Sequence, residues 1–170
     1  QTFAAHVVAN DEWFTTMWVT NAGDATTPVF AHAFGADGHL LEAVALGDLS
    51  PQATLAVNAG DILGEAAMAG DAWVRIGTQA PALGMLAFGT ADHQTYSAMP
   101  MFDWAAYELV FPYVYISDIW FTGVTLINVG PTGADVILEA VSEGGAILDQ
   151  ADVAIPSRGK YVRMVDQIFT

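Results

Sequence analysis

The sequence aligns with itself at a fixed offset that places Trp13 on Trp120. HVVANDEWFTTMWVTNAG, which starts at His6, matches YVYISDIWFTGVTLINVG, which starts at Tyr113, and the alignment runs without a gap to Ser50. One gap beyond Ser50 aligns residues 61–63 with residues 167–169. Identical pairs in this alignment include Val7/Val114, Asp11/Asp118, Trp13/Trp120, Phe14/Phe121, Thr15/Thr122, Asn21/Asn128 and Gly23/Gly130. Trp, Asn and Gly pairs in one register indicate an internal duplication.

Each copy predicts the same series of β-strands. An apolar strand is predicted over residues 6–9 and again over residues 113–116. W-F-T then opens a longer strand that ends at Asn21 or Asn128, where Asn and Gly favour a chain reversal. Asp37-Gly38 and Gly144-Gly145 are typical of hairpin turns. Each copy closes on a short strand and an apolar tail that is long enough for one helical turn.

The polarity pattern favours strands over helices. Val136, Leu138 and Ala140 share one face of an alternating segment, which is the period of a β-strand. Helical spacing is rare, and the best helix candidate covers residues 102–109. We therefore predict an all-β fold: an antiparallel β-sandwich, internally duplicated, whose second copy lacks the final hairpin segment.

The two copies differ in length. Residues 1–107 form the first predicted unit, which includes a hairpin segment at residues 64–107 with a turn at residues 79–81. Residues 108–170 form the second, shorter unit and contain no counterpart of that segment. Two arrangements follow from this difference. Either both copies pack together as one domain around the middle hairpins, or the second unit is incomplete and borrows strands.

The motifs F-P-Y-V (residues 111–114), W-F-T-G-V-T-L-I-N-V-G (120–130), A-W-V-R-I (72–76) and G-M-L-A-F-G (84–89) carry a resemblance. They resemble the tandem β-sandwich repeats, Ig-like or jelly-roll-like, of secreted and largely uncharacterised bacterial surface proteins. The resemblance implies an extracellular setting and carries no catalytic residues across. The second copy departs from it, because no W-V-R-I segment follows residue 130.

Charge limits the partners that the chain can bind. Four Lys and Arg stand against nineteen Asp and Glu, which gives a formal net charge of −15. Such a field repels phosphate backbones and anionic lipid headgroups, so we expect no nucleic-acid partner. The longest apolar stretch, residues 109–127, is interrupted by Pro112 and Asp118, so no membrane insertion is expected. Gln1 in place of an initiator Met is consistent with a processed end, and a secreted or cell-surface protein of bacterial type is expected.

No recognisable catalytic motif is present. The sequence lacks G-x-S-x-G, H-E-x-x-H, an EF-hand loop and any cysteine, so we predict no enzyme and no resident cofactor. Calcium bound by loop carboxylates remains a candidate, because hard cations take oxygen ligands. The carboxylates considered for calcium are Asp11, Asp24, Asp118 and Asp135.

Eight aromatic residues fall between residues 102 and 121. They have three interpretations: core packing, a sugar-stacking platform, or a protein interface rich in Tyr and Trp. Trp13 and Trp120 occupy equivalent positions and are assigned to the core. The residues considered for an interface or a glycan site are Trp104, Tyr107, Tyr113 and Tyr115. Arg158, Lys160 and Arg163 are expected to be solvated charges at a strand edge.

These features favour a structural or adhesive protein that associates with itself, and a filament subunit completed by strand exchange is one form of this hypothesis. In that form the uncharged N-terminal segment QTFAAHVVA is the donated strand. The alternative is a carbohydrate-binding β-sandwich module that uses the aromatic cluster.

Overall fold

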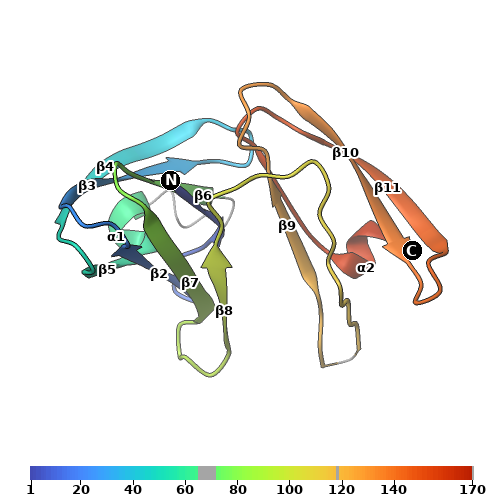
Figure 1. Cartoon of the computed structure of the whole chain (residues 1–170). Helices are drawn as coiled ribbons and strands as arrows, with labels where there is room; N and C mark the ends of the chain where they lie inside the picture. Colours follow the sequence, from blue (N-terminus) through green and yellow to red (C-terminus); the bar gives the residue numbers. More distant parts are fainter. Residues whose placement is uncertain (65–71, 118, 170) are drawn as a thin grey trace.

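The chain folds almost entirely into antiparallel β-strands (Figure 1). The computed structural model describes residues 1–64, 72–117 and 119–169. Every strand pairing within these ranges is antiparallel, so the predicted all-β class is confirmed.

The N-terminal part is a sandwich of two four-stranded sheets, which we call the first sandwich. One sheet has the order β1 (Thr2–Val7), β6 (Ala72–Thr78), β3 (Thr27–Phe34) and β4 (Leu40–Leu49). The other has the order β5 (Thr54–Asn58), β2 (Trp13–Asn21), β7 (Ala82–Thr90) and β8 (Tyr96–Met101). The short helix α1 (Ala59–Leu63) follows β5. Alternate residues of both sheets point inward and form the main core, which includes Met17, Val29, Ile76 and Leu86.

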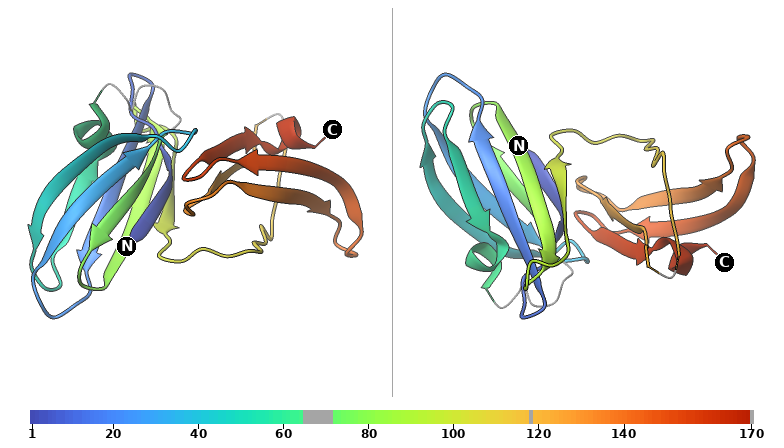
Figure 2. Two further views of the ribbon diagram at one scale, coloured as in Figure 1. Left: turned by 90° about the horizontal axis from the view of Figure 1, so that it is seen from above. Right: turned by 90° about the horizontal axis from the view of Figure 1, so that it is seen from below.

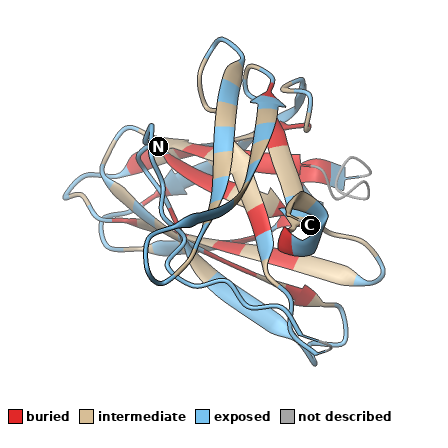
Figure 3. Ribbon diagram, turned by 90° about the vertical axis from the view of Figure 1, so that its right-hand side faces the viewer, coloured by how far each residue is buried: buried red, intermediate tan, exposed pale blue. Residues whose placement is uncertain are grey.

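The C-terminal part, residues 108–169, contains two separate ribbons of two strands each. Strand β9 (Gly123–Ile127) pairs with β12 (Lys160–Met164), and β10 (Ala134–Val141) pairs with β11 (Ile147–Ile155). The short helix α2 (Val165–Ile168) follows β12. Figure 2 shows these ribbons beside the first sandwich. Figure 3 views the molecule from the side of these ribbons, and most of their length is coloured as exposed or half-buried. We call this part the C-terminal half.

The strands of the two parts begin at matching places. β10 and β11 start where the Trp13/Trp120 alignment places the starts of β3 and β4, and β12 starts one position before the counterpart of the start of β5. Side-chain hydrogen bonds recur in the same way. The Thr15 hydroxyl accepts from the Val8 N–H (3.0 Å) and donates to the Val8 carbonyl (2.8 Å). Thr122 makes the same two bonds with Tyr115, at 3.0 and 2.9 Å.

The alignment of the two copies slips by one position at a β-bulge. Val29 pairs with Gly47 and Phe30 with Ala45, so Leu46 is an extra residue in β4, and Gly47 takes a φ of +99°. In the C-terminal half, β11 pairs with the corresponding part of β10 residue by residue, without an extra residue. The gap between the two copies therefore falls at Leu46, before Ser50, and not after Ser50 as predicted. The predicted pair Ser50/Ser157 is consequently out of register by one residue.

The turn at residues 79–81 joins β6 and β7 as expected, and the alternation of Val136, Leu138 and Ala140 on one face of β10 is confirmed. The helix predicted over residues 102–109 is wrong, because Phe102 instead forms a bridge with Phe3 and extended chain follows. The strand predicted over residues 113–116 is also absent from the described pairings, since no neighbouring strand lies beside it.

Asn21 provides a stability test with a matched control. Its side chain is fully buried, donates to the carbonyls of Ala25 (2.8 Å) and Leu49 (2.9 Å), and accepts from the Gly23 N–H (2.9 Å). Asn128 makes the equivalent bonds to Thr132 and Gly130 in a more open setting. Asn21→Ala should lower the free energy of unfolding in urea by about 2–3 kcal/mol, because the buried Leu49 carbonyl and the partly buried Ala25 carbonyl and Gly23 N–H lose their partner. Asn128→Ala should cost about 1 kcal/mol or less. Equal losses would contradict the role of burial.

Candidate interaction surface

Residues 102–117 and 119–121, which we call the aromatic segment, lie on the surface. The exposed fractions of their aromatic side chains range from 48% for Phe102 and Tyr115 to full exposure for Tyr107. The assignment of Trp120 to the core is wrong, since 67% of its side chain is exposed, and Trp13 is half-buried. In the first sandwich the corresponding segment is β1, which is covered because it pairs with β6. Within the described ranges, no strand lies beside the aromatic segment in that way.

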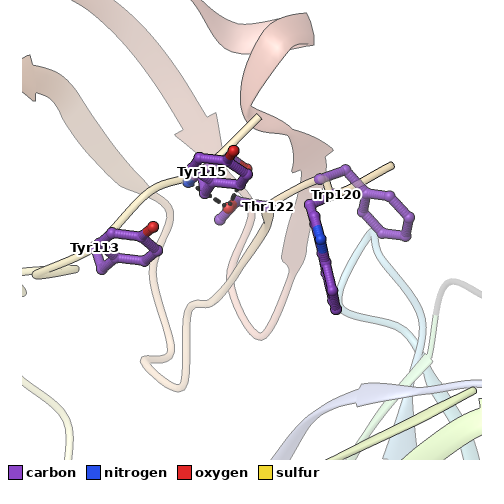
Figure 4. A pocket seen from close by; sticks show the side chains of 5 residues that line it. Tyr113, Tyr115, Trp120 and Thr122 are labelled. Carbon is purple, nitrogen blue, oxygen red and sulfur yellow. Dashed lines mark hydrogen bonds between the residues drawn. The ribbon is translucent and has the colours of Figure 1, made fainter. Parts of the chain in front are cut away.

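A shallow surface pocket of about 500 Å³ lies at the end of the aromatic segment (Figure 4). It is lined by Tyr113, Tyr115, Trp120, Phe121 and Thr122. The two tyrosine rings are almost parallel, with an interplanar angle of 5° and centroids 6.2 Å apart. The Thr122–Tyr115 hydrogen bonds hold the two arms of this loop together. The pocket therefore offers flat aromatic faces and two phenol hydroxyls, and it is open to solvent.

The structure separates the aromatic candidates into two groups. Tyr113 and Tyr115 line the pocket, whereas Trp104 and Tyr107 do not. Trp104 packs edge-on against Phe102, with ring centroids 5.4 Å apart. The predicted set is thus not one site.

The calcium candidates Asp11, Asp24 and Asp135 are exposed residues of separate loops or strands, and Asp118 lies outside the described residues. Within residues 1–64, 72–117 and 119–169, no three His, Asp or Glu side chains are grouped so that they could hold a metal ion.

The C-terminal half has bare strand edges. In the first sandwich β2 lies between β5 and β7, and β3 lies between β4 and β6. Their counterparts β9 and β10 each pair on one side only, with β12 and β11, among the described residues. An edge of this kind presents unpaired N–H and C=O groups that another strand can bind.

The N-terminal segment is already in use within its own sandwich. β1 pairs with β6, and Phe3, Ala4 and Val7 are buried. Donation of this segment to another subunit would therefore require β1 to leave its own sheet.

A polar junction that the sequence analysis missed connects the two parts. Lys160, which was expected to be solvated, is only 6% exposed; its Nζ donates to the Ala72 carbonyl at 2.9 Å and lies 3.4 Å from His6 Nδ1. The Trp73 indole N–H donates to the Arg158 carbonyl at 2.7 Å. The Trp73 ring stacks on Phe34 with centroids 4.6 Å apart. The only sequence signal was that Lys160 is the single lysine of an acidic chain.

Burial of His6 and the nearby Lys160 ammonium lower the pKa of His6 from 6.5 to about 4. Both causes disfavour the charged imidazolium, and desolvation is the larger of the two. Neutral His6 can accept a hydrogen bond from Lys160, whereas protonated His6 would repel it.

No protein-family model matches the sequence, and the comparison with curated proteins finds no match. Among solved structures, the crystal structure of Thermotoga maritima 1070 matches with a TM-score of 0.49 and 16% sequence identity. The match covers 59% of this chain and 90% of that chain. No helix among the described residues is both long and apolar enough to cross a membrane.

The junction predicts a pH dependence of stability. Between pH 6.5 and 4 the unfolded chain binds a proton on His6 and the folded chain does not, so the free energy of unfolding falls as the pH drops through this window. We expect His6 to contribute about 1–3 kcal/mol of this loss. His6→Gln, which keeps a hydrogen-bond acceptor, should remove that contribution in urea denaturation at pH 7 and pH 4.5. His39→Gln, at an exposed histidine, is the control and should match the wild type; an unchanged dependence in His6→Gln would refute the assignment.

Proposed function

We propose that this chain is a non-enzymatic structural or adhesive protein, secreted or at the cell surface, that acts through self-association of its C-terminal half. One observation carries the proposal: a segment with eight exposed aromatic side chains precedes β9 in the chain, and β9 and β10 each have one edge with no strand beside it among the described residues. Exposed aromatic residues are enriched at protein interfaces, and bare edges pair with strands of other chains.

The edge of β9 favours a second copy of this chain as the partner. Its sequence GVTLI is uncharged and rich in β-branched residues. When two β9 edges pair antiparallel across a two-fold axis, only uncharged side chains come opposite each other. Residues 102–121, which precede β9, contain no Lys or Arg and three carboxylates, Asp103, Glu108 and Asp118. The uncharged edge of β9 itself therefore adds no charge repulsion to such a pair.

Growth beyond a dimer needs a second edge. A pair joined at β9 across a two-fold axis is closed, so assembly into a filament would require a second contact between copies. Exchange of β1 as that contact would require β1 to leave its own sheet, where it pairs with β6.

The proposal predicts salt-dependent association. In sedimentation velocity the protein should form dimers or larger assemblies at physiological salt, and these should weaken at low salt, where repulsion between −15 chains is unscreened. The double variant Phe111→Ser/Tyr113→Ser should weaken association by roughly tenfold or more, because it removes apolar contact area. The matched control is Tyr96→Ser, which removes a similarly exposed tyrosine (69%) from the first sandwich. A wild-type protein that stays monomeric at high concentration would reject the proposal.

A glycan-binding function is the second candidate, and the pocket at Tyr113, Tyr115 and Trp120 favours it. Sugar rings bind to flat aromatic faces through their C–H groups, and the two parallel tyrosines offer adjacent faces.

Titration with a panel of polysaccharides should then change the tryptophan fluorescence. Trp120→Ala should abolish the change, because Trp120 lines the pocket. Trp104→Ala should preserve the change, because Trp104 lies outside the pocket. A silent signal across the panel would reject glycan binding while leaving self-association untouched.

A further inference from the structure

The open edge of β10 corresponds to the edge of β3 that pairs with β6 in the first sandwich. In the first sandwich β6 lies between β1 and β3 and pairs with both. The counterpart of β3 is β10, and the counterpart of β1 lies in residues 109–114 of the aromatic segment. Among the described residues, nothing occupies the position between them that corresponds to β6.

The register of β6 on β3 indicates which side chains a new strand would meet. Ala31 pairs with Ile76, His32 with Arg75, and Ala33 with Val74. In the alignment of the two copies, these three acceptor residues correspond to Leu138, Glu139 and Ala140. Leu138 and Ala140 are half-buried on the inner face, so a strand beside them needs apolar residues at alternate positions.

Charge at this edge differs from that in the first sandwich. His32 and Arg75 are both basic, and the Arg75 charge, after burial, helps to lower the pKa of His32. Glu139 takes the place of His32 on β10 and is exposed, as is Asp135 on the same face. Opposite charges on directly opposed residues stabilise a strand pair, so this edge favours a basic residue opposite Glu139.

The same charges disfavour a second β10 as the occupant. Two β10 edges paired antiparallel would bring Asp135 and Glu139 of one chain near those of the other, and like charges across strands are destabilising. Among the described residues, β6 itself is not available for this edge, because it is held between β1 and β3.

We propose that the free edge of β10 is a strand-acceptor site for an extended segment of a different polypeptide, apolar at alternate positions and with Arg or Lys opposite Glu139. This site is separate from the self-association surface at β9 and does not depend on it.

The test uses a synthetic peptide with the sequence AWVRIGT, which is that of residues 72–78. Binding of the fluorescently labelled peptide to the full chain is followed by anisotropy. We expect Glu139→Lys to weaken binding about five- to tenfold, because an attractive pair becomes a repulsive one. A peptide with Glu in place of its Arg should show the reverse preference and bind Glu139→Lys better than the wild type.

Glu143→Lys is the matched control. It makes the same change in net charge at an exposed residue just beyond the end of β10. It should leave peptide binding close to that of the wild type. Equal weakening by both variants would show that net charge alone attracts the peptide and would overturn the site. Absence of binding to the wild type, or binding that Glu139→Lys leaves unchanged, would overturn it as well.

The register can be tested independently, since the chain contains no cysteine. Ile137 occupies the β10 position that corresponds to Phe30, which pairs with Gly77. Ile137→Cys should therefore form a disulfide with a peptide that carries Cys at the Gly77 position. A peptide with Cys at the Trp73 position should react much more slowly. Equal rates would overturn the proposed register.

Discussion

The backbone pairing of β6 with both β1 and β3 is the interaction on which the rest of the structure depends. β6 is the strand that turns two edges into the interior of one sheet, and its residues Val74 and Ile76 are fully buried in the main core. Paired backbone groups and buried apolar side chains reinforce each other here, because a strand can cover a core only if its own N–H and C=O groups are satisfied.

The C-terminal half shows what the same series of strands does without that pairing in the described structure. β9 and β10 remain edge strands, and the buried apolar residues among the described part of this half are Val124, Ile155 and Val165. The segment that corresponds to β1 is extended over the surface with its aromatic rings in solvent. The exposure of this segment and the open edges of β9 and β10 thus have one physical cause: among the described residues, no strand of this half takes the position of β6. We therefore place both proposed interactions in this half.

The junction at Trp73 and Lys160 gives the C-terminal half a fixed attachment to the first sandwich. Trp73 belongs to β6 itself, and its indole N–H binds the Arg158 carbonyl, while Lys160 binds the carbonyl of Ala72, the first residue of β6. Ile127 and Val129 pack against the small cluster of Phe3, Phe34 and Trp73. β6 therefore joins β1 and β3 through its two edges, and its first two residues bind the C-terminal half.

Local sequence patterns determined much of this protein. The all-β class, the hairpin turns at Gly38 and Gly145, and the alternation along β10 follow from backbone preferences and side-chain period, which need no distant partner. Tertiary structure decided which apolar residues are covered. Trp13 and Trp120 both open a Trp-Phe-Thr motif, yet Trp13 is half-buried and Trp120 is exposed, and Lys160 is buried although it is charged. Burial depends on which strands lie alongside, and that is a property of pairings between residues far apart in the chain.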